Sequence, residues 1–246
     1  SANYRMAAVL WLLTLLLWLG LTYAIFSALT IKTVKPSLEK GIDGSWLLAV
    51  VATQSLAVLS CLIAAKSGQS WQLELNFFAL SMWLWGGMLY IWMISLIFYR
   101  YIFFRLSPAD LTPPYWINMG AMAISTLAGT LLIANAADAH FLHSLLPFLK
   151  GFTVFYWATG TWWIPMLLVL GVWRHVYERF PLRYDPLYWG AVFPLGMYAV
   201  GTQHMAQAME LHFITLLPTL FAIIALCAWA VAFAAYLFEF RRGRGG

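Results

Sequence analysis

The sequence predicts an all-α membrane protein, a polytopic bundle of seven transmembrane helices in a single domain over residues 1–246. Of its 246 residues, 63% are apolar and only 9% are charged, whereas an average soluble domain has about 25% charged residues. Aromatic residues make up 17% of the chain and include 14 tryptophans, and tryptophan and tyrosine are enriched at membrane interfaces. A water-exposed globular surface is therefore excluded.

Seven apolar stretches each reach the ~20 residues that a membrane-spanning helix needs. Proline marks several of the connections between them, for example Pro36, Pro108 and Pro181. No connection is long and polar enough to form a separate soluble domain. The expected spans are residues 4–29, 46–65, 73–104, 117–136, 151–176, 188–209 and 214–238.

Basic residues are distributed unevenly between the two ends of this expected bundle. Arg5, Lys66 and Lys150 fall at one end, and all the other lysines and arginines fall at the opposite end. Because cytoplasmic loops carry the excess of positive charge, we expect the carboxyl terminus in the cytoplasm and Ser1 outside, in the inner (plasma) membrane of a bacterium. The same bias accounts for the net charge of +5, so no nucleic-acid partner is inferred.

Polar and small residues are concentrated in the second, fourth and sixth spans. Such residues are unfavourable against acyl chains and permit close approach of helices, which predicts three inner spans alternating with four outer, lipid-facing ones in hairpins. Two interpretations remain open: these residues join helices together, or they line a pore. The pore-lining candidates are Thr53, Gln54, Asn118, Gly120, Ser125, Thr126, Gly129, Gly196, Thr202 and Gln203.

The interior of the expected bundle is neutral, since no Asp, Glu, Lys or Arg lies at the centre of any span. Proton pumps and cation-coupled carriers usually keep an ionisable group at that depth, whereas a neutral lining of hydroxyls and amides suits a permissive path for anions. The metalloprotease motif His-Glu-x-x-His, paired mid-helix aspartates and a lysine in the last span are all absent. We therefore predict no enzyme, no metal site and no cofactor, and we expect His204 to be a hydrogen-bonded structural residue.

The pair Phe193-Pro194 lies inside the sixth span. A proline within a helix removes one backbone hydrogen bond and bends the helix, and Gly196 adds compliance two residues later. A bend of this kind can aim the ring of Phe193 across a pore, where it would block hydrated ions. The alternative is an ordinary phenylalanine packed beside a proline kink.

Three segments resemble the tellurite-resistance/C4-dicarboxylate transporter family, which includes plant slow-type anion channels and yeast malate and sulfite carriers. They are residues 113–129, which begin Pro-Pro-Tyr-Trp-Ile-Asn-Met-Gly, residues 46–56, and residues 189–198 with the Phe-Pro pair. The segments fall in the three spans expected to be inner. The resemblance implies transport of small anions or C4-dicarboxylates, and a phenylalanine on the ninth helix that occludes the pore, which would be Phe193.

The resemblance also implies an architecture larger than seven spans. Family members have ten helices in five hairpins, with five inner helices around a pore and usually three protomers together. The seven spans would then correspond to helices four to ten, with the first three helices lacking, and Ala49 stands where many relatives have proline. The alternative function is a non-transporting seven-helix membrane protein, either a sensor or receptor-like protein or an inactive fragment.

Overall fold

The computed structural model describes residues 2–66 and 71–242, and in these ranges its regular structure is helical throughout, as the sequence predicts. Each expected span corresponds to one long helix. The long helices are α1 (Ala2–Ile31), α3 (Leu48–Ala64), α4 (Gln72–Phe103), α5 (Ile117–Asn135), α7 (Leu146–Val172), α8 (Trp189–Ala208) and α9 (Leu216–Arg242).

Among the described residues, six of these helices are long and apolar enough to cross a bilayer, so the chain is an integral membrane protein. The seventh, α8, is 20 residues long but does not reach the same apolarity. Gln203, His204 and Gln207 near its carboxyl end are the physical reason. The predicted count of seven spans is therefore not confirmed.

Short helical turns, which the sequence analysis did not predict, precede each of the three expected inner helices. Turn η1 (Gly44–Leu47) leads into α3, η2 (Pro113–Trp116) into α5 and η4 (Pro186–Tyr188) into α8. Asp43 and Asp185 accept hydrogen bonds from backbone N–H groups at the start of η1 and η4, each at 2.8 Å. The remaining short elements are α2 (Leu38–Gly41), α6 (His140–Ser144), the π-helical turn η3 (Trp173–Tyr177) and η5 (His212–Ile214).

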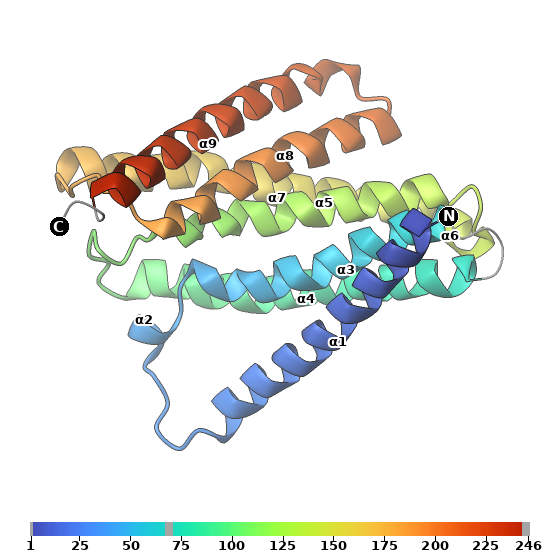
Figure 1. Cartoon of the computed structure of the whole chain (residues 1–246), viewed down its shortest axis with the longest axis horizontal. Helices are drawn as coiled ribbons and strands as arrows, with labels where there is room; N and C mark the ends of the chain where they lie inside the picture. Colours follow the sequence, from blue (N-terminus) through green and yellow to red (C-terminus); the bar gives the residue numbers. More distant parts are fainter. Residues whose placement is uncertain (1, 67–70, 243–246) are drawn as a thin grey trace.

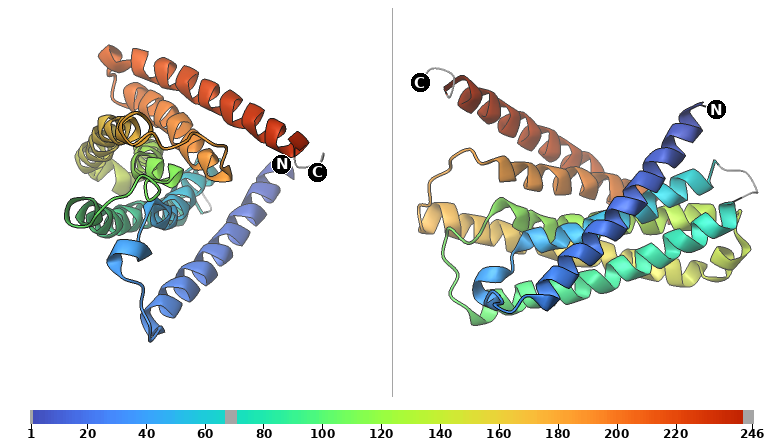
Figure 2. Two further views of the ribbon diagram at one scale, coloured as in Figure 1. Left: turned by 90° about the vertical axis from the view of Figure 1, so that its left-hand side faces the viewer. Right: turned by 60° about the horizontal axis from the view of Figure 1, so that its bottom comes forward.

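Helix α5 forms the centre of the bundle and lies between α3 and α8 (Figure 1). In its most apolar stretch 78% of the residues are buried, compared with 11% in α9 and none in α1. The end-on view in Figure 2 shows α1 and α9 inclined to the bundle on opposite sides of it. The expected inner position is thus clearest for α5, and the expected outer position is clearest for α1 and α9.

Tryptophan side chains on outer helices form hydrogen bonds with the inner helix that comes next among the long helices of the chain. In every case the indole N–H donates across the interface to a hydroxyl or carbonyl oxygen of the inner helix, which satisfies both groups inside the bundle. The bonds are Trp11 to Ser60 at 2.8 Å and Trp18 to Thr53 at 2.9 Å between α1 and α3, Trp83 to the Ser125 carbonyl at 2.8 Å between α4 and α5, and Trp157 to Thr202 at 3.0 Å between α7 and α8.

Candidate functional site: the exposed face of α8

One face of α8 is exposed along most of the helix. Phe193 is 43% exposed and Val200 is 44% exposed, and His204 and Gln207 are exposed further along. Residues separated by seven, four and three positions lie on the same side of a helix. These four side chains therefore form a continuous strip, which we call the α8 strip.

The α8 strip differs in chemistry from the exposed surfaces of the outer helices. On α1 and α9 the large exposed residues are mainly Leu, Ile, Val and Phe, as expected for helices that face acyl chains. The α8 strip instead carries an imidazole and an amide at its carboxyl-terminal half. His204, which the sequence analysis expects to be a hydrogen-bonded structural residue, is exposed.

The rotation of α8 is set by its close packing on α5. A side-chain carbon added at Gly120 would lie 2.7 Å from Cγ of Pro194, and one added at Gly201 would lie 2.7 Å from the carbonyl oxygen of Ala123. Only glycine permits the two helices to approach so closely. Because Pro194 is buried in this interface, the neighbouring Phe193 is directed away from the bundle core.

Helices α7 and α9 hold α8 from its other sides. The hydroxyls of Thr161 and Tyr198 are 2.8 Å apart, and the Tyr198 ring lies 4.5 Å from the ring of Phe221 between centroids. On the exposed side there is free space, since nothing lies within 4 Å of the position that a Cβ of Gly196 would occupy. Phe193 therefore projects from a firmly held helix next to an unobstructed position.

The structure does not bring all the predicted pore-lining residues together. Gly196 and Gln203 lie on α8 and are only partly buried. Thr53 and Thr202 are buried, and each accepts the hydrogen bond of an outer-helix tryptophan. The pore role of these residues stays a prediction, and no pattern in the sequence indicates their tryptophan partners.

Several other candidates have packing contacts with neighbouring helices. Gln54 is buried and donates to the Trp83 carbonyl at 3.0 Å. A Cβ at Gly129 would press on the Thr153 hydroxyl of α7 and lie 2.9 Å from the Trp83 ring of α4, so this glycine faces both helices. The hydroxyls of Ser125 and Thr126 donate to backbone carbonyls of their own helix at 2.7 and 2.9 Å, and the carbonyl of the buried Asn118 accepts from Tyr90 at 3.0 Å.

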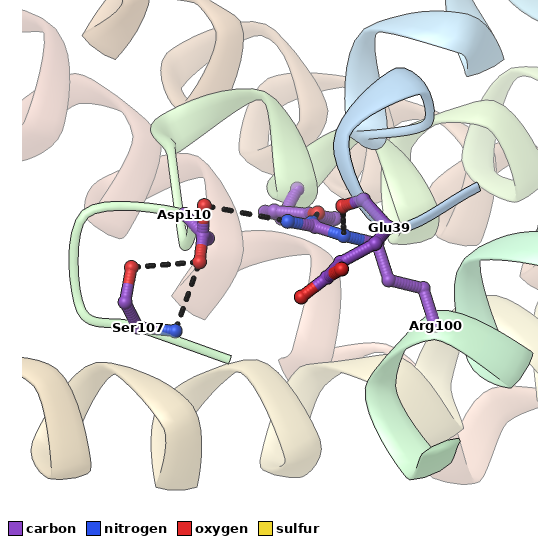
Figure 3. Close-up of polar contacts among 5 residues, drawn as sticks. Glu39, Arg100, Ser107 and Asp110 are labelled. Atoms are coloured by element: carbon purple, nitrogen blue, oxygen red, sulfur yellow. Dashed lines mark hydrogen bonds and ion pairs between the residues drawn. The ribbon is translucent and has the colours of Figure 1, made fainter. Parts of the chain in front are cut away.

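A buried arginine joins the connections at the end of the bundle where η1 and η2 lie (Figure 3). The side chain of Arg100 is only 6% exposed. Its Nε donates to the Glu39 carbonyl at 2.6 Å, one Nη donates to the Tyr115 hydroxyl, and the other Nη lies 3.4 Å from the Asp110 carboxylate. Arg100 thus connects the end of α4 to α2, to η2 and to the loop before η2.

The Asp110 carboxylate is itself held by local hydrogen bonds. The Ser107 hydroxyl and backbone N–H donate to it at 2.7 and 2.9 Å. These two bonds, with the positive charge of Arg100 as a smaller cause, hold the pKa of Asp110 below its usual value. The carboxylate therefore stays ionised at neutral pH, where it can pair with Arg100.

Comparison with known proteins gives a family match over nearly the whole chain. Residues 2–237 match the model of the voltage-dependent anion channel family (SLAC1). The chain belongs to this family. The resemblance seen in the sequence is confirmed at that level, and membrane transport of anions is the function that membership of the voltage-dependent anion channel family supports.

The relatives include both short and long chains. An uncharacterized membrane protein of Mycobacterium tuberculosis is 41% identical over 149 residues, which are 61% of this chain and 75% of the relative. A chain named an uncharacterized transporter in Methanocaldococcus jannaschii is 25% identical over 164 residues, which are 65% of this chain and 45% of the relative. A sulfite efflux pump of Trichophyton rubrum is 24% identical over 249 residues, which are 96% of this chain and 63% of the relative. No solved structure matches the chain.

Proposed function

We propose that the protein moves small anions or C4-dicarboxylates across the inner (plasma) membrane of a bacterium, passively or together with protons. The path follows the α8 strip, and Phe193 is the ring that occludes it. The observation that carries the proposal is the exposure of Phe193 beside the buried Pro194, on a helix face that also bears an imidazole and amides.

The polarity of the α8 strip supports an aqueous path over a lipid contact. A polar side chain within a membrane-spanning segment is costly against acyl chains and normally faces the bundle interior or a water-filled cavity. His204 and Gln207 are exposed in this chain, so lipid would leave their hydrogen-bonding groups unsatisfied. An aqueous path along α8 satisfies them.

The neutrality of the inner helices supports anions as the transported class. Helices α3, α5 and α8 contain no Asp, Glu, Lys or Arg. Such a wall has no fixed negative charge to repel an anion, and the amide and imidazole N–H groups offer donors to it. A sulfite efflux pump among the relatives is consistent with a small oxyanion as substrate.

Phe193 suits a gate because its exposed side chain stands on a helix that α5, α7 and α9 hold in place. Gly120 and Gly201 fix α8 against α5, whereas the space beside Gly196 is free. The ring can therefore change its rotamer without moving the helix. An aromatic ring in a narrow path blocks hydrated ions, and its removal leaves the path open.

The proposal assigns the seven long helices to helices four to ten of the ten-helix arrangement that the family resemblance implies, as one transmembrane domain. In that arrangement α3, α5 and α8 are three of five inner helices and form one wall of the path. Three protomers assemble together. The proposed trimer can be tested by measuring the mass of the assembly. The proposed helix numbering can be tested by comparison with longer homologous chains.

The test is anion flux into liposomes that contain the purified protein, with chloride, nitrate, sulfite and malate as probes. We expect Phe193→Ala to raise the flux of at least one of these anions several-fold. Phe233→Ala is the matched control, because Phe233 on α9 is 39% exposed, which is close to the 43% of Phe193. Its flux should equal that of the wild type.

Three results would count against the proposal. Unchanged or lower flux in Phe193→Ala would remove the gate, and an equal rise in Phe233→Ala would mean that the rise reflects a general loosening of the protein. Absence of flux in all variants, with the fold intact, would favour the non-transporting alternative.

A further inference from the structure

A pocket of about 700 Å³ lies between α1 and α3, apart from the α8 strip. Its volume falls in the range of about 300–1,000 Å³ that is typical of small-molecule sites. One wall is α1 from Thr14 to Leu29, and the other is η1 with the first half of α3 up to Ser55. We propose that this pocket binds an acyl chain of an anionic phospholipid. The headgroup of this lipid lies on the side of the membrane that is predicted to be cytoplasmic.

The shape of the pocket follows from the inclination of α1. Trp11 and Trp18 fasten the first half of α1 to α3 by hydrogen bonds of 2.8 and 2.9 Å. Beyond them α1 diverges from the bundle (Figure 1), and residues 32–43 connect its far end back to η1. The pocket is therefore a half-open wedge that narrows toward Trp18, and a flexible chain fits such a taper better than a straight transmembrane helix does.

Three of the four hydroxyl groups that line the wedge donate hydrogen bonds within the protein, and the fourth hydroxyl is that of Thr22. Thr14 donates to the Leu10 carbonyl at 2.7 Å, and Ser55 donates to the Val51 carbonyl at 2.8 Å. Ser45 donates to the Asp43 carboxylate. The hydroxyls of Thr14, Ser45 and Ser55 therefore leave no donor for an incoming polar ligand, and Thr22 is the one lining hydroxyl outside this set.

The two indole rings of the wedge have their N–H groups occupied in the same way. Trp18 donates to Thr53, and Trp46 donates to the Gly41 carbonyl at 2.8 Å. The rings therefore present carbon to the wedge, beside apolar residues of α1 and α3. A hydrocarbon chain is the occupant that such a lining accepts without loss of hydrogen bonds.

The charge at the wide end of the wedge selects an anionic headgroup. The connection between the two walls, residues 32–43, carries Lys32, Lys35 and Lys40, all exposed, against two acidic residues, Glu39 and Asp43. Clusters of basic residues at the cytoplasmic surface attract anionic lipids. Because this connection runs from the end of α1 back to η1, its lysines lie on the side of the wide end of the wedge, where the proposal places the headgroup.

The experiment is native mass spectrometry of the purified full chain, loaded with phosphatidylglycerol or with phosphatidylcholine of the same acyl chains. The wild type is expected to retain phosphatidylglycerol more strongly. The triple variant Lys32→Gln, Lys35→Gln, Lys40→Gln should lose that preference, with affinity falling about fivefold for each lysine. As the charge control, Arg179→Gln with Arg183→Gln removes two basic residues of another loop and should bind as the wild type does.

A second variant tests the acyl-chain site independently of charge. Ala52 lines the wedge and is exposed, so Ala52→Trp should fill the space and reduce the binding of both lipids. Ala222→Trp on the exposed surface of α9 is the control. Equal retention of the two lipids by the wild type would overturn the proposal, as would wild-type lipid binding by Ala52→Trp. A dimer that Ala52→Trp dissociates would overturn it in favour of a second copy as the occupant. Flux measurements do not enter this test, so it stands or falls apart from the proposed transport.

Discussion

Replacement of Arg100 by glutamine is expected to lower the free energy of unfolding by about 3–5 kcal/mol, because a hydrogen bond to a charged group contributes roughly 1.5–3 kcal/mol. The guanidinium makes two such bonds, to the Glu39 carbonyl and the Tyr115 hydroxyl, and Tyr115 is only 1% exposed. The ion pair with Asp110 adds less than about 1 kcal/mol, since the carboxylate is 38% exposed and therefore screened by solvent.

The assay is thermal unfolding of the purified protein in detergent, followed by helix content. For a chain of this size the loss corresponds to a fall in Tm of roughly 10 °C. Arg100→Lys should lie in between, because a lysine keeps the charge but lacks the planar fork that serves several partners. A loss in Asp110→Asn as large as that in Arg100→Gln would refute the reasoning, since it would place the stabilisation in the exposed ion pair.

Three further outcomes can be checked by the same unfolding assay. Gly201→Ala should destabilise the protein by about 1–3 kcal/mol, because its new Cβ would press on the Ala123 carbonyl at 2.7 Å. Gly171→Ala should instead stabilise the protein by up to about 1 kcal/mol, because nothing lies within 4 Å of its new Cβ. Equal effects of the two changes would contradict the close packing of α5 and α8. Trp157→Phe should cost about 1 kcal/mol for the lost indole bond in addition to the lost ring area, and a neutral result would mean that the bond does not form. Because the pKa of Asp110 is lowered in the folded protein, its stabilisation should be present at pH 7 and be lost as the pH falls below about 4 through the lowered value; a difference between the wild type and Asp110→Asn that persisted at pH 2 would contradict this.

Six of the long helices follow from the sequence because each needs only a sufficient apolar length, which α8 does not reach. The side that each helix turns toward its neighbours cannot be predicted from the sequence in the same way. Thr53 and Thr202 were grouped with Gly196 as one lining by their polarity, yet the two threonines accept indole hydrogen bonds. A helix that is apolar nearly all round has no polar stripe from which its rotation can be predicted.

The buried arginine shows a second limit of the same kind. From the sequence, Arg100 counts among the basic residues of one membrane side, and nothing near it predicts burial. Its carbonyl partner on Glu39 is 61 positions away in the chain. Such a contact depends on how α2 folds back over the end of α4, which local pattern does not specify.

The tryptophan hydrogen bonds have a consequence for how the protein is made. Each of them joins helices that leave the ribosome soon after one another: α1 with α3, α4 with α5, and α7 with α8. A hydroxyl or carbonyl acceptor of an inner helix can therefore find its indole donor as soon as the two helices of its pair have entered the bilayer, before later helices exist. The helices are synthesised in the same order in which their polar groups gain hydrogen-bond partners. The helices can therefore insert into the bilayer pair by pair.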